Sequence, residues 1–347
     1  MIYCKGTIFF ITLQSINHHV FRFMLSKLYY KLHSGKNNKF IYLVKNYLSL
    51  LIPNSIFRAK LQAALKSIDT RADKDYILKR VDYYCKLTPG SIVPNNSPCI
   101  GKHDKRWHKV YWFDSREYTR WFTPSLHWVF RPGDINFIPE SPSIVKSRPI
   151  SEDDANANGV ILKLNKVRHF IFVNDPVSFR EKKDIAIFRG KVKDKPQRVA
   201  FFEKYFSNPM CNLGDISRYP EHNEWHVEKM TIADHLKYKF ILALEGNDVA
   251  SNLKWVMSSN SVAVMPRPTC ETWFMEGTLI PNYHYIEIKP DFSDLEERLN
   301  HYIQHPNEAE SIIKHAHEYV NQFKDKKRED IISLLVLDKY FRMTGQK

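Results

Sequence analysis

One stretch in the second half of the chain has an order of apolar and polar residues that predicts a strand, a turn, a helix and a second strand. Residues 240–244 form an unbroken apolar run of strand length, and turn-forming residue types interrupt it at 245–248. Apolar residues recur at helical spacing over 249–257, and 261–265 is a second apolar run. In a parallel unit of this kind the helix amides face the crevice where nucleotide phosphates bind, although most such units bind no ligand at a given turn. The expected phosphate-site residues are Gly246, Asn247 and Ser251.

The rest of the pattern alternates between helices and strands, as in α/β proteins. Residues 72–86 have helical spacing, and an aromatic-rich region over 109–150 turns into strands that end in loops. Residues 184–188 and 284–288 are further apolar runs of strand length, and the chain is helical from 293 to its end. We therefore expect an α/β fold.

The composition allows a large core and excludes several classes of protein. The chain has 347 residues, of which 43% are hydrophobic and 14% aromatic, so it is long enough for two domains. Its five cysteines are widely spread without a CxxC pair, which argues against a disulfide framework and a structural zinc site and favours a reducing compartment. Neither GxGxxG nor GK[ST] occurs, so dinucleotide oxidoreductases and P-loop enzymes are unsupported.

Positive charge is concentrated at the start of the chain. The formal charge is +14, and ten Lys and Arg residues before Asp69, with no acidic residue among them, contribute +10. Apolar and aromatic residues over 40–52 lie between these bases. This composition is typical of a segment that lies on an anionic bilayer. It also fits nucleic-acid binding, or a helix packed on the body with solvated lysines. Residues 7–24 are interrupted by polar residues well short of the ~20 apolar residues that a membrane span needs.

A carboxylate follows the strand predicted at 127–131. Asp134 lies in the turn after this strand, a position where α/β proteins commonly place site residues. A group transfer to a hydroxyl needs a base that takes the proton from that hydroxyl, and Asp134 is our candidate, with Asp114 in reserve. A solvated turn aspartate is the alternative interpretation.

Several motifs resemble glycosyltransferase family 90, most closely its bacterial lipopolysaccharide core glycosyltransferases. The main one is the stretch Asp-His-Leu-Lys-Tyr-Lys-Phe at 234–240, followed by Glu245-Gly246 and Ala250-Ser251. Asp134, with the prolines after it and the Lys-Ser-Arg element at 146–148, is similar to the base turn of the O-glucosyltransferases, although its spacing is shorter. That element contributes the expected acceptor or cleft residues Lys146, Ser147 and Arg148.

The resemblance also assigns the donor-binding residues. Phe188-Arg189-Gly190 matches the family's Phe-Arg-Gly element, which implies that Lys191 and Arg198 contact the donor diphosphate. A Glu-Trp element around Trp273 implies that Glu271 or Glu276 binds the ribose. Many members carry an arginine where this chain has Leu253, and either Lys254 or Arg267 is expected to supply the missing charge.

Together these observations predict two Rossmann-like α/β domains facing a cleft, the GT-B arrangement. The expected division is an upstream extension at 1–23, a basic aromatic segment at 24–70, an acceptor-side domain at 71–175 and a nucleotide-sugar-binding domain at 176–347, with Met1 or Met24 as the true start. The expected function is inverting transfer of glucose or galactose from a nucleotide sugar such as UDP-hexose to a lipopolysaccharide core sugar, with no metal and no cofactor. The expected location is the inner face of the cytoplasmic membrane. The alternative is a non-catalytic basic protein that docks on anionic membrane or nucleic acid, although we expect no nucleic-acid partner.

Overall fold

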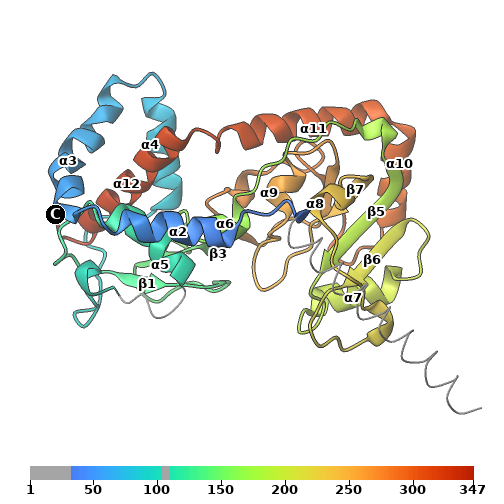
Figure 1. Ribbon diagram of the computed structural model, residues 1–347, viewed down its shortest axis with the longest axis horizontal. Helices are drawn as coiled ribbons and strands as arrows, with labels where there is room; N and C mark the ends of the chain where they lie inside the picture. Colours follow the sequence, from blue (N-terminus) through green and yellow to red (C-terminus); the bar gives the residue numbers. More distant parts are fainter. Residues whose placement is uncertain (1–32, 104–108) are drawn as a thin grey trace, which may run out of the picture.

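The structure is a computed structural model, and it describes residues 33–103 and 109–347. The extension expected at 1–23 and the start of the basic aromatic segment lie outside the described residues. Figure 1 shows two lobes, one built mostly of helices and the other around a sheet. The α/β class is confirmed, because both lobes contain parallel strands.

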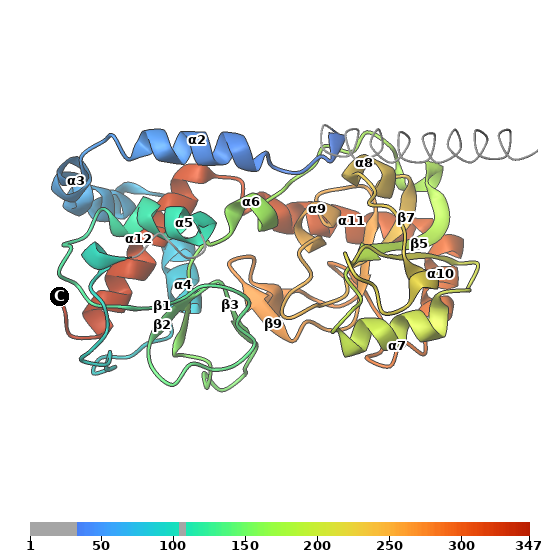
Figure 2. The same cartoon turned by 60° about the horizontal axis from the view of Figure 1, so that its bottom comes forward.

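The first lobe combines helices with a small sheet. Three strands of three residues each form a parallel sheet in the order β1-β2-β4. The elements are α2 (Lys39–Ser49), α3 (Asn54–Lys66), η1 (Ser67–Thr70), α4 (Lys74–Tyr84), η2 (Ile100–Lys102), α5 (Lys109–Thr119), β1 (Val129–Arg131), β2 (Ser143–Val145), β3 (Ser147–Pro149), β4 (Gly159–Ile161) and α6 (Lys166–His169). Helix α2 lies along the outside of this lobe with α5 and α6 beneath it (Figure 2).

The second lobe surrounds a five-stranded parallel sheet in the order β10-β8-β7-β5-β6. Its central strand is buried along its whole length, which explains the unbroken apolar run in the sequence. The elements are η3 (Phe179–Glu181), β5 (Lys183–Gly190), α7 (Pro196–Tyr205), β6 (Cys211–Asp215), η4 (Asn223–Trp225), α8 (Ile232–His235), β7 (Tyr238–Leu242), α9 (Leu253–Val256), β8 (Val262–Met265), β9 (Cys270–Thr272), η5 (Glu276–Thr278), β10 (Ile286–Glu287), α10 (Leu295–Gln304), α11 (Pro306–Asn321) and α12 (Lys326–Met343).

The prediction of a helix over residues 249–257 was wrong in its length. Only α9 is helical there, with four residues, and the chain before it follows turns and bends. Polar side chains in this stretch bond elsewhere and so compete with helix formation: Asn252 donates to the carbonyl of Leu242 at 2.9 Å, and Asp248 accepts from Ser147 at 2.6 Å. A helix this short has too few aligned peptide units for a strong dipole, so a phosphate at this turn would depend on other groups, and the phosphate-site residues stay a prediction.

A strand pairing and the last helix both join the lobes. Strand β3 of the first lobe pairs antiparallel with β9 of the second. The last helix, α12, returns from the second lobe and packs against α3, α4 and α5 (Figure 1). The boundary expected near residue 176 stays a prediction, but a single cut there separates α12 from the helices that it contacts.

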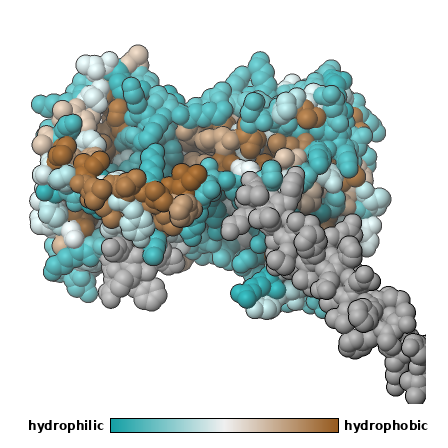
Figure 3. Space-filling model, viewed as in Figure 1, coloured by the Kyte–Doolittle hydropathy of each residue, from teal (hydrophilic) through white to brown (hydrophobic). Residues whose placement is uncertain are grey.

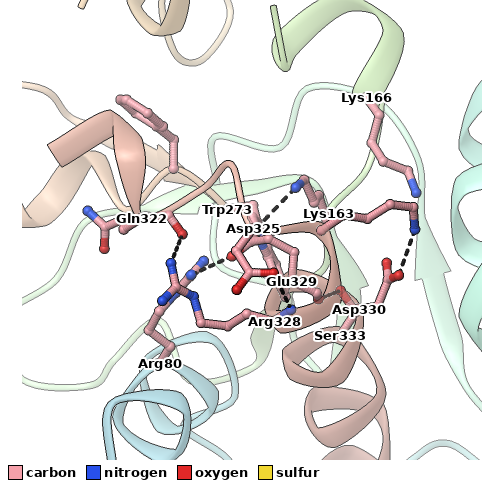
Figure 4. A network of polar contacts seen from close by, with 12 residues as sticks. Arg80, Lys163, Lys166, Trp273, Gln322, Asp325, Arg328, Glu329, Asp330 and Ser333 are labelled. Carbon is pink, nitrogen blue, oxygen red and sulfur yellow. Dashed lines mark hydrogen bonds and ion pairs between the residues drawn. The ribbon is translucent and has the colours of Figure 1, made fainter. Parts of the chain in front are cut away.

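A buried carboxylate on α12 reinforces this return. Glu329 accepts from Arg80 on α4 at 2.5 Å, from the indole of Trp273 at 2.5 Å and from Lys163 at 3.2 Å (Figure 4). Arg80 and Glu329 are each about 2% exposed as side chains. Three donors therefore surround this buried carboxylate, so it lacks no hydrogen-bond partner in the core.

No single helix in the described part of the chain has the length and apolar character to cross a bilayer alone. Two consecutive helical segments, Lys39–Ser49 and Asn54–Thr70, are together long and apolar enough for a span. The chain bends by 93° between them.

Candidate functional site

A cleft of about 890 Å³ lies at the carboxyl ends of β5 and β7 and reaches across to the first lobe. Basic side chains dominate the described residues that line it. They are Lys36, Arg168, Arg189, Lys191, Lys193, Lys195, Arg198, Arg218 and Lys229, against the carboxylates Asp134, Asp194 and Asp248. We call this hollow the basic cleft. Its charge favours an anionic ligand of nucleotide size.

Arg198, on the first turn of α7, is the most constrained of these bases. Its guanidinium donates to three backbone carbonyls, those of Lys191 at 2.7 Å, Leu244 at 2.7 Å and Glu245 at 2.9 Å. Burial lowers its pKa to about 10, and within the described ranges no carboxylate forms an ion pair with it. The cation is therefore held in place by backbone carbonyls, and the carboxylates of Asp215 and Glu245 act on it only through longer-range charge interactions.

Two glycines leave room for this guanidinium. A Cβ atom at Gly246 would lie 3.1 Å from Nη2 of Arg198, and one at Gly190 would lie 3.3 Å from Nη1. The Gly190 position would also bring a Cβ atom to 2.5 Å from the ring of Phe188. The glycines of both turns are thus explained by the close approach of Arg198.

Arg189 and Lys191 complete the cluster at the end of β5. Arg189 donates to the carbonyl and side chain of Asn212 at 2.8 and 2.7 Å, while its Nε is buried without a partner. Burial lowers the pKa of Arg189. Lys191 is exposed in the cleft, and Lys193 reaches outward to Glu221 at 3.9 Å.

Asp134 faces the same cleft from the first lobe. Its carboxylate is 2.5 Å from the ammonium of Lys146 and accepts from Asn247 at 3.2 Å, and its side chain is 24% exposed. Burial by itself raises the pKa of Asp134, but the charge and hydrogen bond of Lys146 outweigh this effect and lower it. Asp134 is therefore ionised and still reachable from solvent.

Asp248 is a residue of this cluster that the sequence did not single out. It is buried, lies 2.6 Å from Lys146 and accepts from Ser147 at 2.6 Å. In the sequence it reads only as one of four turn residues after β7. Its partners lie a hundred positions away, so no local signal reveals it.

We predicted that Arg148 and Glu271 lie in the substrate cleft, but the structure places them elsewhere. Their side chains form a buried ion pair at 2.7 Å across the β3–β9 pairing, with Arg148 completely buried. Arg148 also donates to the carbonyls of Tyr83 and Gly159, and the hydroxyl of Tyr83 donates to Glu271. All three side chains are engaged in joining the lobes.

Lys254 and Glu276 also pair with each other. Both are buried, 2.6 Å apart, and Glu276 accepts further bonds from the amide and hydroxyl of Thr272. Arg267 is exposed and 3.4 Å from Glu287. None of these residues lines the basic cleft. Neither Lys254 nor Arg267 therefore supplies the cleft with the charge of the arginine that many family members carry at the position of Leu253. Arg168 on α6 does line the cleft, which no motif indicated.

The reserve base Asp114 is buried on α5 and accepts from the hydroxyl of Tyr42 at 2.6 Å and from the amide of Lys166 at 3.0 Å. It does not line the cleft. The structure therefore brings together Asp134, Lys146, Asn247, Ser251 and the bases on β5 and α7.

Comparison with known proteins identifies similar sequences. The family model described as "Glycosyl transferase family 90" matches residues 160–343. A protein named O-glucosyltransferase LpsA, from Dichelobacter nodosus, is 39% identical over 267 residues, which cover 77% of this chain and 83% of that protein. The family match includes the cleft residues from Arg168 to Trp255 and begins after Asp134.

Proposed function

Because the chain belongs to glycosyltransferase family 90 and is a glycosyltransferase, we propose that it moves glucose or galactose from UDP-hexose to a hydroxyl of a lipopolysaccharide core sugar. The observation that carries this proposal is the basic cleft, whose cations surround a space of nucleotide size with one accessible carboxylate, Asp134, at its edge. The GT-B arrangement is part of the proposal, since the cleft takes residues from both lobes. Because the chain is a glycosyltransferase, the alternative of a non-catalytic protein that only docks on membrane or nucleic acid is not pursued.

The reaction is a single displacement with inversion. The acceptor oxygen attacks the anomeric carbon of the hexose while the bond from that carbon to the diphosphate oxygen breaks. Asp134 takes the proton of the acceptor hydroxyl, and UDP leaves with the bonding electrons. Lys191 and Arg198 stabilise the charge that develops on the diphosphate, and because the backbone already holds Arg198, little reorganisation is needed. This scheme uses no metal and no cofactor.

The direct test is a donor screen with a purified, truncated core acceptor, together with heat denaturation in the presence of UDP. UDP should raise the melting temperature, because a ligand that binds only the folded state stabilises it. Transfer from a UDP-hexose with inverted anomeric configuration supports the proposal. Retention of configuration, or no effect of UDP, contradicts it.

Replacement of Arg198 tests the diphosphate contact. We expect Arg198→Ala to weaken UDP binding by about 1.5–3 kcal/mol, the usual worth of a charge-assisted hydrogen bond, and to leave uridine binding almost unchanged. Titration calorimetry with both ligands measures this difference. Because Arg198 also holds three carbonyls, Arg198→Lys is the control that keeps the charge. Equal losses for UDP and uridine would mean that Arg198 only supports the backbone.

Lys146 should set the acid limit of activity. Asp134 has a lowered pKa, so its active, ionised form persists below the usual aspartate pKa of about 3.9 and is lost only as pH falls through the lower value. We expect Lys146→Met to raise the pKa of Asp134 and to move the acid limb of the kcat/KM profile to higher pH. An unchanged acid limb would show that another group controls it.

Membrane association at the inner face of the cytoplasmic membrane is also part of the proposal. Exposed apolar side chains gather over α2 and the turn after it (Figure 3). Phe40, Ile41, Leu48 and Leu51 are 61–79% exposed, and no residue of α2 is buried. Exposed bases such as Lys39 and Lys45 accompany them. An apolar surface rimmed by positive charge fits an anionic bilayer.

A further inference from the structure

A second hollow, of about 870 Å³, lies between α2, α5 and α12. We call it the α2 groove. Much of its lining is apolar or aromatic, with Ile41, Phe57, Phe113, Trp121 and Phe170 among its residues. Its apolar rim is formed by Ile41 on α2 and Ile52 in the turn after it, which are 64% and 44% exposed. The groove therefore has the character of a site for an apolar chain that enters over this exposed rim.

Charged residues in the α2 groove are of two kinds. One kind is neutralised: Lys163 lies 3.2 Å from Glu329, and Lys166 forms an ion pair with Glu117. Figure 4 shows this side of the groove, where Glu329 is surrounded by its donors. The other kind has no ion pair in the described part of the chain, and it comprises Lys45, Lys324 and the two arginines Arg116 and Arg120.

Arg120 is the more unusual of the two arginines. It is only 7% exposed, and its guanidinium donates to the carbonyls of Ser49 and Ile52 at the end of α2, at 3.2 and 2.5 Å. Its Nε is buried without a hydrogen-bond partner, and its guanidinium carbon lies 3.7 Å from the centre of the Phe57 ring. A buried cation without a counter-ion is costly, and a bound anion would remove that cost.

Arg116 lies one helical turn before Arg120 on α5 and adds a second cation. It donates to Asn54 at 3.0 Å and stacks near Trp112. Burial lowers the pKa of both arginines, that of Arg120 to about 10. Two arginines at this spacing present several N–H donors on one helix face, which suits the oxygens of a phosphate group.

The α2 groove adjoins the basic cleft. Asn37 and Val167 line both hollows, so the two lie next to each other at these residues. The cleft end of a molecule that spans both would approach the hollow that contains Asp134. Its groove end would meet Arg116, Arg120 and the apolar rim.

We propose that the α2 groove binds the acceptor itself, through a phosphate group and adjoining apolar chain that the acceptor carries as a membrane amphiphile. Arg116 and Arg120 hold the phosphate, and the aromatic lining takes the first part of the chain. The sugar end then lies toward Asp134. The identification of this amphiphile as the acceptor rests on the proposed transferase function, whereas binding of the phosphate and chain does not.

The first test uses water-soluble probes and the full-length protein. Dihexanoylphosphatidic acid below its micelle concentration should bind with a change in tryptophan fluorescence, since Trp121 lines the groove. Dihexanoylphosphatidylcholine and inorganic phosphate should each bind at least tenfold more weakly, because the first masks the phosphate charge and the second lacks the chain. Equal binding of the two lipids would overturn the phosphate assignment.

Variants locate the binding. Arg116→Gln and Arg120→Gln should each weaken binding of dihexanoylphosphatidic acid by about ten- to a hundredfold. The control is Lys79→Gln, which removes an exposed base of α4 outside both hollows and should bind as wild type. Arg116→Gln leaves the contacts of Arg120 with α2 intact, so it remains informative if Arg120→Gln does not fold. Unchanged binding in Arg116→Gln would overturn the proposal.

Kinetics then distinguish the acceptor from bulk lipid. In Arg116→Gln the KM for a lipid-linked acceptor in detergent should rise about tenfold, while kcat, UDP binding and transfer to a de-lipidated oligosaccharide hold. Weaker phosphatidic acid binding with an unchanged acceptor KM would mean that the groove takes ordinary phospholipid, which overturns the acceptor assignment. If the wild type binds the lipid but neither binds UDP nor transfers sugar, the proposed function fails and the groove remains.

Discussion

Asp134→Asn should lower turnover by roughly 10²–10⁴-fold, the range that loss of a general base costs. The amide of asparagine cannot take the proton of the acceptor hydroxyl, yet it has nearly the same shape and can still accept from Lys146. Folding and UDP binding should therefore stay near wild type. Steady-state kinetics with a saturating donor, together with UDP calorimetry and a melting curve, measure the three quantities.

The control for this experiment is Asp114→Asn. Asp114 is buried beneath Tyr42 and does not line the basic cleft, so its loss should affect stability and not the chemical step. If turnover survives in Asp134→Asn, the base is another group of the cleft. His235 lines it, and burial lowers the pKa of His235 to about 4, so that its imidazole is neutral but a weaker base than an ordinary histidine.

Removal of positive charge from α2 and α3 should release the protein from anionic vesicles. Lys39, Arg58, Lys60 and Lys66 are all exposed, and each base near such a surface contributes on the order of 1 kcal/mol. Replacing the four by glutamine should therefore weaken vesicle binding by about 4 kcal/mol, or close to a thousandfold. High salt should reproduce the loss in the unmodified protein, because it screens exposed charges. Vesicle sedimentation measures both effects.

Activity should then depend on the acceptor. Transfer to a lipid-anchored core in vesicles should fall, while transfer to a soluble oligosaccharide should hold, because none of the four bases lines the basic cleft. Leu51→Ser, which removes a side chain that is 79% exposed, is the matched apolar variant and should weaken vesicle binding without changing its salt dependence. Equal loss with both acceptors, or vesicle binding that ignores salt, would mean that these helices only pack on the body.

The sequence predicted those parts of the structure whose cause is local. Strands β7 and β8 appear as apolar runs because parallel strands covered on both faces bury every residue. The glycines and Arg198 were found through motifs close together in the chain. In contrast, α9 is shorter than its apolar spacing suggests, because Asn252 and Asp248 form bonds that the spacing does not record.

The errors in the candidate site arise from partners distant in sequence. Lys254 has its charge neutralised by Glu276, and Arg148 by Glu271, 123 positions away. In the sequence, such a cation seems able to bind a phosphate, but in the fold its charge is already neutralised by a carboxylate. The opposite case is a cation that the sequence does not single out but that has no ion pair in the described part of the fold. Arg168, Arg116 and Arg120 are of this kind, because nothing near them in the chain indicates it.

The return of α12 to the first lobe affects how this enzyme can be recombined with its relatives. A chimera cut near residue 176 would place the first lobe of one protein against the α12 of another, so that Glu329 would face an unrelated set of partners in place of Arg80 and Lys163. The exchangeable unit is discontinuous, with residues 326–343 travelling together with the N-terminal part. The β3–β9 seam must also be matched, since Arg148 and Glu271 come from opposite sides of the cut. The two lobes can be exchanged between relatives without breaking these contacts only along that discontinuous boundary.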